Sequence, residues 1–356
     1  MNTVVLHSLL PFFGIIVVLV LVHESGHFIA AKLSHVRVLE FGVGFPPRIA
    51  AFKFHDTEYS LNALPLGGFV RMVGEEDPTE PGSLASRPKR LRLFVLSAGA
   101  LSNFLFAIVL FSASFIIPHE VSIGRAMITD VMPGSPAQAA GLQTGDIIYN
   151  VDGRNVQNVS DASYDIRLHL GETLKMTVKR GTELVDVNVK ARWAPPSNQG
   201  PTGITIASQY PFTETQSYAP LTALRLGWRE TFDSLQLARN EVISWVKGAT
   251  APQVTGPVGI VQATGEVVKE AGWKSLIEFM GLISINLAVV NILPFPFLDG
   301  GRIVFVLVEV LRRGRRIAPQ KEALVHLAGL AVIMTFVVVV SYFDIARIIH
   351  GQSIFR

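Results

Sequence analysis

Four long apolar runs set the strongest limit on what this chain can fold into. They cover roughly residues 5–34, 94–117, 276–311 and 323–349. A helix crosses the hydrocarbon core of a bilayer with about 20 apolar residues, and each run is at least that long. Hydrophobic residues also make up 49% of the 356 residues, more than soluble proteins usually carry. The sequence therefore predicts a polytopic α-helical membrane protein with four transmembrane helices.

We expect the first run to be retained as an anchor, and the basic residues predict how the spans are oriented. The run is too long for a signal peptide and lacks a small-residue cleavage site. No Lys or Arg precedes it, whereas loop 35–93 holds eight and loop 312–321 holds five. Because Lys and Arg concentrate on the cytoplasmic side, both loops should face the cytoplasm. The N-terminus, residues 118–275 and the C-terminus should then lie outside.

The composition excludes several kinds of chemistry. The sequence contains no cysteine, which rules out disulfides, thiolate catalysis and zinc sites built from cysteine. Its net charge is only +3, and no basic face indicates binding to nucleic acid. Any metal ion must therefore be bound by His, Asp or Glu.

Between the first two spans, the sequence alternates polar and apolar residues in a way that is typical of strands. The segment FKFHDTEYSLNA shows this alternation around a polar turn, and LPLGGFVRM follows with turn glycines. We expect a small β-hairpin sheet over about residues 52–73 on the cytoplasmic side. A plain surface hairpin without a membrane role would show the same pattern.

Residues 118–200 form a second β-rich region, outside the spans. Strand-like runs over 122–192 alternate with Pro-Gly, Gly-Asp and Asp-Gly turns. The segment SPAQAAGLQTGDIIYNVDG resembles a bacterial PDZ domain. That resemblance implies a groove that binds an extended peptide by adding it as a strand to a sheet edge. A domain that only filters by size is the alternative.

Residues 201–275 are expected to contain a linker and then an amphipathic interfacial helix. The segment APPSNQGPTG at 194–203 has the Pro, Gly and Ser content of a linker. Over 219–247, large apolar side chains alternate with Arg and Lys, as on a helix that lies on a membrane surface. Packing against the other domains would explain the pattern equally well. Residues 1–117 and 276–356 then hold the two pairs of transmembrane helices.

The first apolar run contains two histidines and a glutamate, in the stretch VLVLVHESGHFIAAKL. His23 and His27 are four residues apart, so a helix places both imidazoles on one face, where they can reach a single ion. Glu24 beside them is a carboxylate that can take a proton from a water activated by the metal. This HExxH pattern predicts a zinc site. Satisfied polar residues in the core of a helix bundle are the alternative.

A catalytic zinc needs a third protein ligand and an open fourth position, and Asp299 is the best candidate. It follows the segment NILPFPFL, in which Pro294 and Pro296 interrupt helical hydrogen bonding, and it precedes two glycines that allow close backbone approach. A broken helix at membrane depth is tolerated where it lines a polar cavity. A helix-capping role for Asp299 is the alternative.

Three other polar residues of the later spans are assigned structural roles. Two of them have an arginine within one helical turn, and the third suits a core or interface position. They are Glu309, Asp344 and His326.

Two asparagines are candidates for contact with a substrate. Asn291 lies on the broken element and could hold a substrate backbone or stabilise an oxyanion. Asn103 lies four residues after Gly99 in SAGALSNFLFA, so the two share a helix face. On physical grounds alone, this pair indicates helix packing rather than catalysis.

Together these motifs resemble the site-two protease family of intramembrane zinc metalloproteases, of the bacterial RseP type with a single PDZ domain. The resemblance rests on HESGH, GALSN and NILPFPFLDGG in the first three runs and on the PDZ-like insert. It implies that His23, His27 and Asp299 bind Zn²⁺ and that Glu24 is the catalytic base. It also implies that the hairpin after the first span holds the substrate extended near the zinc.

The resemblance further implies a bacterial cytoplasmic membrane, with the active site toward the cytoplasm and the PDZ domain outside. The expected substrates are single-span membrane proteins already trimmed outside, such as anti-sigma factors, or signal-peptide remnants. Two other functions fit parts of the sequence: a membrane-anchored PDZ scaffold with structural zinc, and a metal or ion transporter. Glu24 beside the ligands argues against the scaffold. The lack of a polar trail across the spans argues against the transporter.

Overall fold

The computed structural model describes residues 8–351, with gaps at 76–78, 197, 253 and 271. Residues 5–7 of the first predicted span lie outside this range. The chain divides into two compact units. Unit 1 comprises Met1–Ser114, Leu224–Thr231 and Val254–Arg356, and unit 2 comprises Phe115–Ala223 and Phe232–Gln253.

Among the described residues, four helices are long and apolar enough to cross a membrane. Two come early in the chain, α2 (Leu10–Leu33) and α3 (Lys89–Ile116). Two come late, α8 (Gly272–Ile292) and α10 (Pro319–Ile349). A shorter helix, α7 (Pro257–Glu270), precedes α8. The predicted number of apolar spans is therefore confirmed, and the third is shorter than predicted.

The third apolar run, predicted over 276–311, is broken in its middle. After α8 the chain passes through the loop 293–298, and α9 (Asp299–Leu311) begins there. Two prolines in this loop lack the N–H that a continuous helix would need. A Cβ added to Gly300 would lie 2.0 Å from the carbonyl oxygen of Leu293, so the backbone approach requires glycine. The loop therefore turns tightly onto the start of α9.

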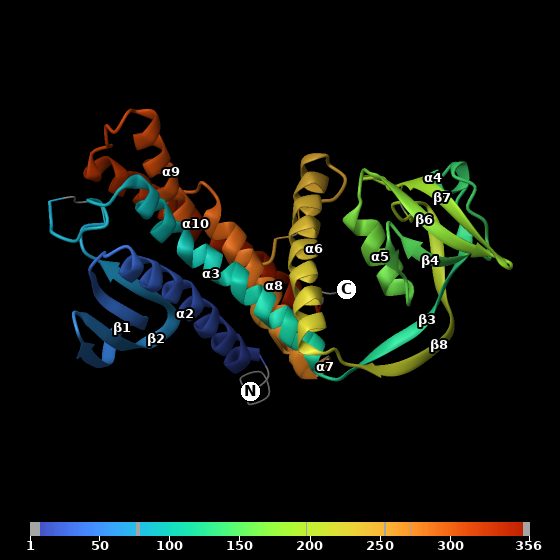
Figure 1. The fold of residues 1–356 in the computed structure, drawn as a ribbon, viewed down its shortest axis with the longest axis horizontal. Coiled ribbons are helices and arrows are strands. Elements are labelled where there is room, and N and C mark those ends of the chain that lie inside the picture. Colours follow the sequence, from blue (N-terminus) through green and yellow to red (C-terminus); the bar gives the residue numbers. More distant parts are fainter. Residues whose placement is uncertain (1–7, 76–78, 197, 253, 271, 352–356) are drawn as a thin grey trace. The chain divides into compact units, whose positions relative to one another are not determined.

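Small residues let α2 and α3 pack closely side by side in unit 1 (Figure 1). A Cβ added to Gly26 would lie 2.2 Å from Oγ of Ser102 and 2.4 Å from the carbonyl oxygen of Ala98. Such close contact through small residues is typical of helices in membranes. The apolar core beside this crossing also includes α9 and the strands after α2. Its buried members are Ala30, Ala31, Val36, Val38, Met72, Leu84, Val95, Leu96, Ala98 and Val306.

The two strands between α2 and α3 form a larger sheet than the hairpin predicted over 52–73. They are β1 (Val38–Phe54) and β2 (Thr57–Met72), and they pair antiparallel. The early part of β1 has buried residues at every second position, which places one face on the core of unit 1. The prediction of a hairpin in this region is therefore correct, but its first strand begins further toward the N-terminus.

Each of these strands bends, so the sheet has four segments. Residues 38–43 lie between 57–62 and 68–72 and pair with both. Residues 48–54 pair with the opposite edge of 57–62, so the order of the segments across the sheet is 68–72, 38–43, 57–62 and 48–54. Segment 68–72 is therefore at one edge of the sheet and 48–54 at the other.

Unit 2 is built on a six-stranded antiparallel sheet, and the alternating runs had predicted a β-rich region here. Its main path has the order β7-β6-β4-β3-β8, and the short β5 pairs with β4. Two helices, α4 (Pro136–Ala139) and α5 (Val159–Leu168), pack their apolar residues against the core of the sheet. The strands are β3 (His119–Val131), β4 (Ile147–Val151), β5 (Arg154–Asn155), β6 (Thr173–Arg180), β7 (Glu183–Lys190) and β8 (Ile204–Gln216).

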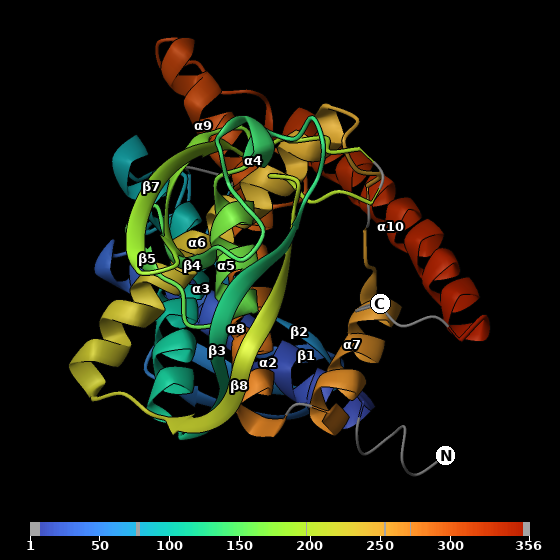
Figure 2. The ribbon, with the colours of Figure 1, turned by 90° about the vertical axis from the view of Figure 1, so that its right-hand side faces the viewer.

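The sheet of unit 2 extends beyond the boundary that we predicted at residue 200. Strand β8 pairs with β3 from Ile204, opposite Val131, to Gln216, opposite His119. Figure 2 shows the two as long paired strands. Most residues of β8 are polar or exposed, so the sequence lacked the apolar alternation of a half-buried strand. The linker pattern is therefore confined to the residues before β8.

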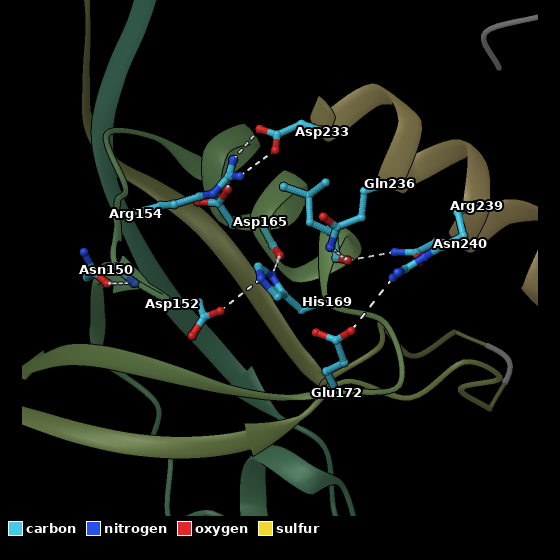
Figure 3. Close-up of polar contacts among 12 residues, drawn as sticks. Asn150, Asp152, Arg154, Asp165, His169, Glu172, Asp233, Gln236, Arg239 and Asn240 are labelled. Atoms are coloured by element: carbon cyan, nitrogen blue, oxygen red, sulfur yellow. Dashed lines mark hydrogen bonds and ion pairs between the residues drawn. The ribbon is translucent and has the colours of Figure 1, made fainter. Parts of the chain in front are cut away.

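Helix α6 (Pro220–Val246) matches the predicted amphipathic helix, and its second half packs on α5 in unit 2 (Figure 3). The amide nitrogen of Asn240 donates to the carbonyl oxygen of Leu168 at 2.8 Å. This bond satisfies a backbone acceptor at the C-terminus of α5. Arg154 donates two hydrogen bonds of 2.6 Å to the carboxylate of Asp233. For this half of α6, domain packing therefore explains the polar side chains.

Asp146 is a buried carboxylate of unit 2 with several hydrogen bonds. It is 1% exposed and accepts from the backbone N–H of Gln143 at 2.9 Å and from Arg180 at 2.9 and 2.7 Å. Burial alone would raise the pKa of this carboxyl, but the bonds from Arg180 and Gln143 outweigh burial and hold the pKa below its ordinary value. The carboxylate therefore stabilises unit 2 above about pH 4, and this contribution is lost as the pH falls through the folded-state pKa.

We expect Asp146→Asn to lower the free energy of unfolding of unit 2 by about 1–3 kcal/mol at pH 7, because Arg180 loses its charged partner. The difference from wild type should begin to shrink below about pH 4, where Asp146 of the unfolded chain takes up a proton, and should be lost as the pH falls through the lower folded-state pKa. Pulse proteolysis of the detergent-solubilised chain in increasing urea measures both effects. Asp130→Asn, at an exposed position on β3, is the control. Equal effects of the two variants would contradict this role of Asp146.

Candidate metal centre

Three side chains from distant parts of the sequence meet in unit 1. His23 and His27 lie on α2, and Asp299 is the first residue of α9. Nε2 of His27 is 3.2 Å from Nε2 of His23, and Oδ2 of Asp299 is 3.1 Å from both nitrogens. The three side chains are 12%, 8% and 18% exposed, in the order His23, His27 and Asp299. The cluster is therefore nearly closed to solvent.

The separations between these atoms fit a zinc ion. Nitrogen ligands lie about 2.0–2.1 Å from zinc, so two ligands of a tetrahedral ion are about 3.3 Å apart. The three separations in the cluster are close to this value. Two imidazole nitrogens and one carboxylate oxygen are also a donor set of catalytic zinc sites, which keep a fourth position for water or substrate. These residues can therefore hold zinc without rearrangement.

A contact from α3 orients one of the imidazoles. Nδ1 of His27 donates a hydrogen bond to the carbonyl oxygen of Val95 at 2.8 Å. Because the proton is held on Nδ1, the lone pair of Nε2 faces the cluster, as a metal ligand requires. Nδ1 of His23 is buried and has no hydrogen-bond partner within the part of the chain that the structure describes. The orientation of His27 is therefore the better fixed of the two.

Gly99 on α3 provides the space that the imidazoles occupy. A Cβ added to Gly99 would lie 2.4 Å from Nε2 of His27 and 2.6 Å from Nε2 of His23, and real Cβ atoms essentially never come that close. The sequence pattern assigned Gly99 to packing between helices. The structure shows that the packing partners are the two candidate ligands. A small residue in an apolar run carries no signal that could have identified them.

Glu24 lies on the same helix as the histidines, and its side chain contacts the edge segment 68–72 of the sheet. The backbone N–H of Val70 hydrogen-bonds to the Glu24 carboxylate. A Cβ added to Gly68 would lie 3.2 Å from Cγ of Glu24, so glycine allows the strand to lie close to α2. The glutamate is therefore next to His23 in the sequence and in contact with a strand edge.

The two asparagines predicted to contact substrate differ in their surroundings. Asn103 lies one turn after Gly99 on α3 and is fully buried. Neither polar atom of its side chain has a hydrogen-bond partner among the described residues, which is uncommon for a buried amide. Asn291 lies in the last turn of α8 and is half-buried.

The acidic residues assigned structural roles are engaged in other ion pairs. Glu309 is 2.5 Å from Arg92 of α3 and 3.4 Å from Arg316, whereas its spacing predicted a pair with the arginines three and four residues after it. Asp344 is 2.8 Å from Arg347, as its spacing predicted. Its carboxylate also accepts the backbone N–H of Gly256 at 2.9 Å, just before α7. Asp299 is therefore the carboxylate that joins the histidines in the described part of the chain.

Comparison with known proteins decides what kind of protein carries this cluster. The sequence matches Peptidase family M50 over residues 11–336, a stretch that includes both histidines and Asp299. The chain belongs to peptidase family M50. Zinc metalloprotease RasP of Oceanobacillus iheyensis is 28% identical to this M50 chain, with 98% of the chain and 100% of RasP covered. Membrane metalloprotease ARASP of Arabidopsis thaliana is 30% identical, with 92% of the chain and 76% of ARASP covered.

This M50 chain is also similar to a further relative and to one solved structure. A protein of Clostridium perfringens is 34% identical to it, with 92% of the chain and 95% of that protein covered. The crystal structure of the PDZ domain of an SdrC-like protein from Listeria monocytogenes matches 24% of the chain and 92% of that domain, at 24% identity and a TM-score of 0.22. Membership of the family confirms the predicted function: the chain is an intramembrane zinc metalloprotease.

We expect Gly99→Ala to reduce the zinc content of the M50 peptidase to about a tenth of the wild-type value or less, because the added methyl group would displace both imidazoles. Metal analysis of the purified protein measures this content. Gly14→Ala, also in a membrane helix, adds a Cβ with no atom within 4 Å and should retain zinc. Full zinc content in Gly99→Ala would contradict the packing described above.

Proposed function

We propose that the M50 peptidase hydrolyses peptide bonds at a zinc site formed by His23, His27 and Asp299, with Glu24 as the general base. The convergence of three ligand atoms within 4.8 Å in a nearly closed cluster is the observation that carries this proposal. Zinc, when bound there, supplies Lewis-acid chemistry that polarises a carbonyl group and makes water nucleophilic near neutral pH. The other steps depend on the side chains of this chain.

Glu24 is suited to the proton transfers by its position. It adjoins His23 on α2, and the N–H of Val70 holds its carboxylate in place. In the proposed reaction Glu24 takes a proton from the attacking water and passes it to the nitrogen of the leaving amine. The water oxygen joins the carbonyl carbon, and the carbon–nitrogen bond of the peptide breaks.

A substrate helix must be unwound before cleavage, because a helix uses its carbonyl oxygens in its own hydrogen bonds. We assign the capture of the unwound substrate to segment 68–72, the sheet edge that lies against Glu24. An extended peptide that pairs with this edge gains backbone hydrogen bonds in exchange for those of its helix. Asn103 and Asn291 are the side chains that we assign to the substrate backbone or the oxyanion.

The orientation in the membrane follows from the basic loops. The proposal places loops 35–93 and 312–321 in the cytoplasm and unit 2 outside, in a bacterial cytoplasmic membrane. Because the chain has no cysteine, single cysteines at Arg315 and Thr182 can be labelled separately with a membrane-impermeant maleimide. Labelling of both from the same side of sealed cells would contradict this orientation.

The substrates that we propose are single-span membrane proteins already shortened outside, such as anti-sigma factors, or signal-peptide remnants. Unit 2 would then bind the remaining outer segment or exclude proteins that still carry a large domain. Strand β8 is an edge of the described sheet, and an extended peptide can pair with such an edge. The motif resemblance to PDZ domains supports the same use of unit 2.

We expect Glu24→Gln to reduce cleavage of a model transmembrane substrate by at least about 10²-fold while zinc stays bound, because the amide cannot accept the proton from water. Cleavage is measured in detergent or liposomes, and zinc content in the same sample. Glu183→Gln, on an exposed position of β7, is the matched control and should leave both unchanged. Wild-type turnover by Glu24→Gln would contradict the assigned base.

A further inference from the structure

The loop that precedes Asp299 is held by a helix that contributes no metal ligand. The loop 293–298 lies between the end of α8 and the start of α9, and the backbone N–H groups of Leu293, Phe295 and Leu298 donate to nearby backbone carbonyl oxygens. Within it, Phe297 has a φ of 81°, a left-handed conformation that residues other than glycine rarely adopt. Such a conformation persists where the surrounding structure enforces it. The contacts of Phe297 therefore decide where Asp299, two residues later, is placed.

The partner of Phe297 comes from α10. The backbone N–H of Phe297 donates a hydrogen bond to Nδ1 of His326 at 2.8 Å. Since Nδ1 must be the acceptor, the proton of the neutral ring is on Nε2, which is 3.9 Å from a carboxylate oxygen of Glu322. The ring also contacts Phe305 of α9, with centroids 5.4 Å apart. His326 is thus fixed against both the loop and α9.

A second contact on the same face of α10 supports this interpretation independently. Gly329 lies one turn after His326, so the two residues face the same neighbour. A Cβ added to Gly329 would lie 2.5 Å from Cβ of Pro296 and 2.6 Å from its carbonyl oxygen. The helix α10 therefore packs directly against the backbone of the loop.

We infer that His326 is a positioning residue for Asp299: by accepting the N–H of Phe297, it fixes the turn that directs the Asp299 carboxylate at the two imidazoles. The inference rests on the proposed function only in taking Asp299 as a zinc ligand. It gives the last membrane helix a part in the metal site, although that helix supplies no ligand. Sequence spacing could not show this, because nothing links position 326 to position 297 along the chain.

The test compares two replacements of His326 that differ in one acceptor. Asparagine carries an oxygen at the position of Nδ1, whereas leucine has a similar size and no acceptor. We expect His326→Leu to weaken zinc binding about tenfold or more, as the loss of groups that orient a ligand usually does. His326→Asn should restore binding to within about twofold of wild type. Competition with a chromophoric chelator measures the affinity of the full chain in detergent, with Leu327→Ala, an exposed neighbour, as the control.

A second readout does not depend on the metal. In the zinc-free chain, hydrogen exchange of the peptide that contains Phe297 should be faster in His326→Leu than in wild type and unchanged in His326→Asn. Gly329→Ala keeps His326 but displaces the loop by a different contact, so it should also weaken zinc binding. It serves as the test variant if His326→Leu fails to fold. The inference would be overturned if His326→Leu kept wild-type zinc affinity and exchange, or if His326→Asn lost as much zinc affinity as His326→Leu. Neither result would affect the proposed function. A wild-type chain that binds no zinc would instead overturn the proposed function.

Discussion

Two imidazoles and a carboxylate face one another in a nearly closed site, where we propose that they share a zinc ion. Their ligand atoms are 3.1–3.2 Å apart, and the side chains have little contact with solvent. Burial of such groups among apolar helices is costly unless they are partnered. A divalent ion would satisfy all three at once, because each group can offer it a lone pair. In the proposed site, the shared ion explains why α2 and the start of α9 meet.

The three side chains can come together because glycines lie where the backbones approach one another closely. Gly26 lets α3 approach α2, and Gly99 leaves room for the imidazoles. Gly300 allows the broken element to fold back on the end of α8. The break between α8 and α9 has two structural consequences. It ends a helix that would otherwise carry Asp299 past the site, and it creates a loop that neighbouring helices can fix in one conformation.

Much of this site could be predicted because its parts are local in the sequence. The spacing of His23 and His27 fixes their common face on any helix, and the prolines before Asp299 require a break wherever that residue lies. The four spans follow from length and apolarity. What the residues could not show is which distant backbones touch. The Val95 carbonyl, the space at Gly99 and the bent strands of β1 all depend on tertiary packing, which leaves no periodic pattern.

The coordination of zinc in the wild-type chain tests the shared ion most directly. X-ray absorption spectroscopy of the chain loaded with one zinc should show two imidazole nitrogens and oxygen ligands, all at about 2.0–2.2 Å. The signal of one imidazole should disappear in His23→Ala and in His27→Ala, and an oxygen should change in Asp299→Ala. Zinc bound through oxygen alone, or with both imidazoles still present in either histidine variant, would contradict the account.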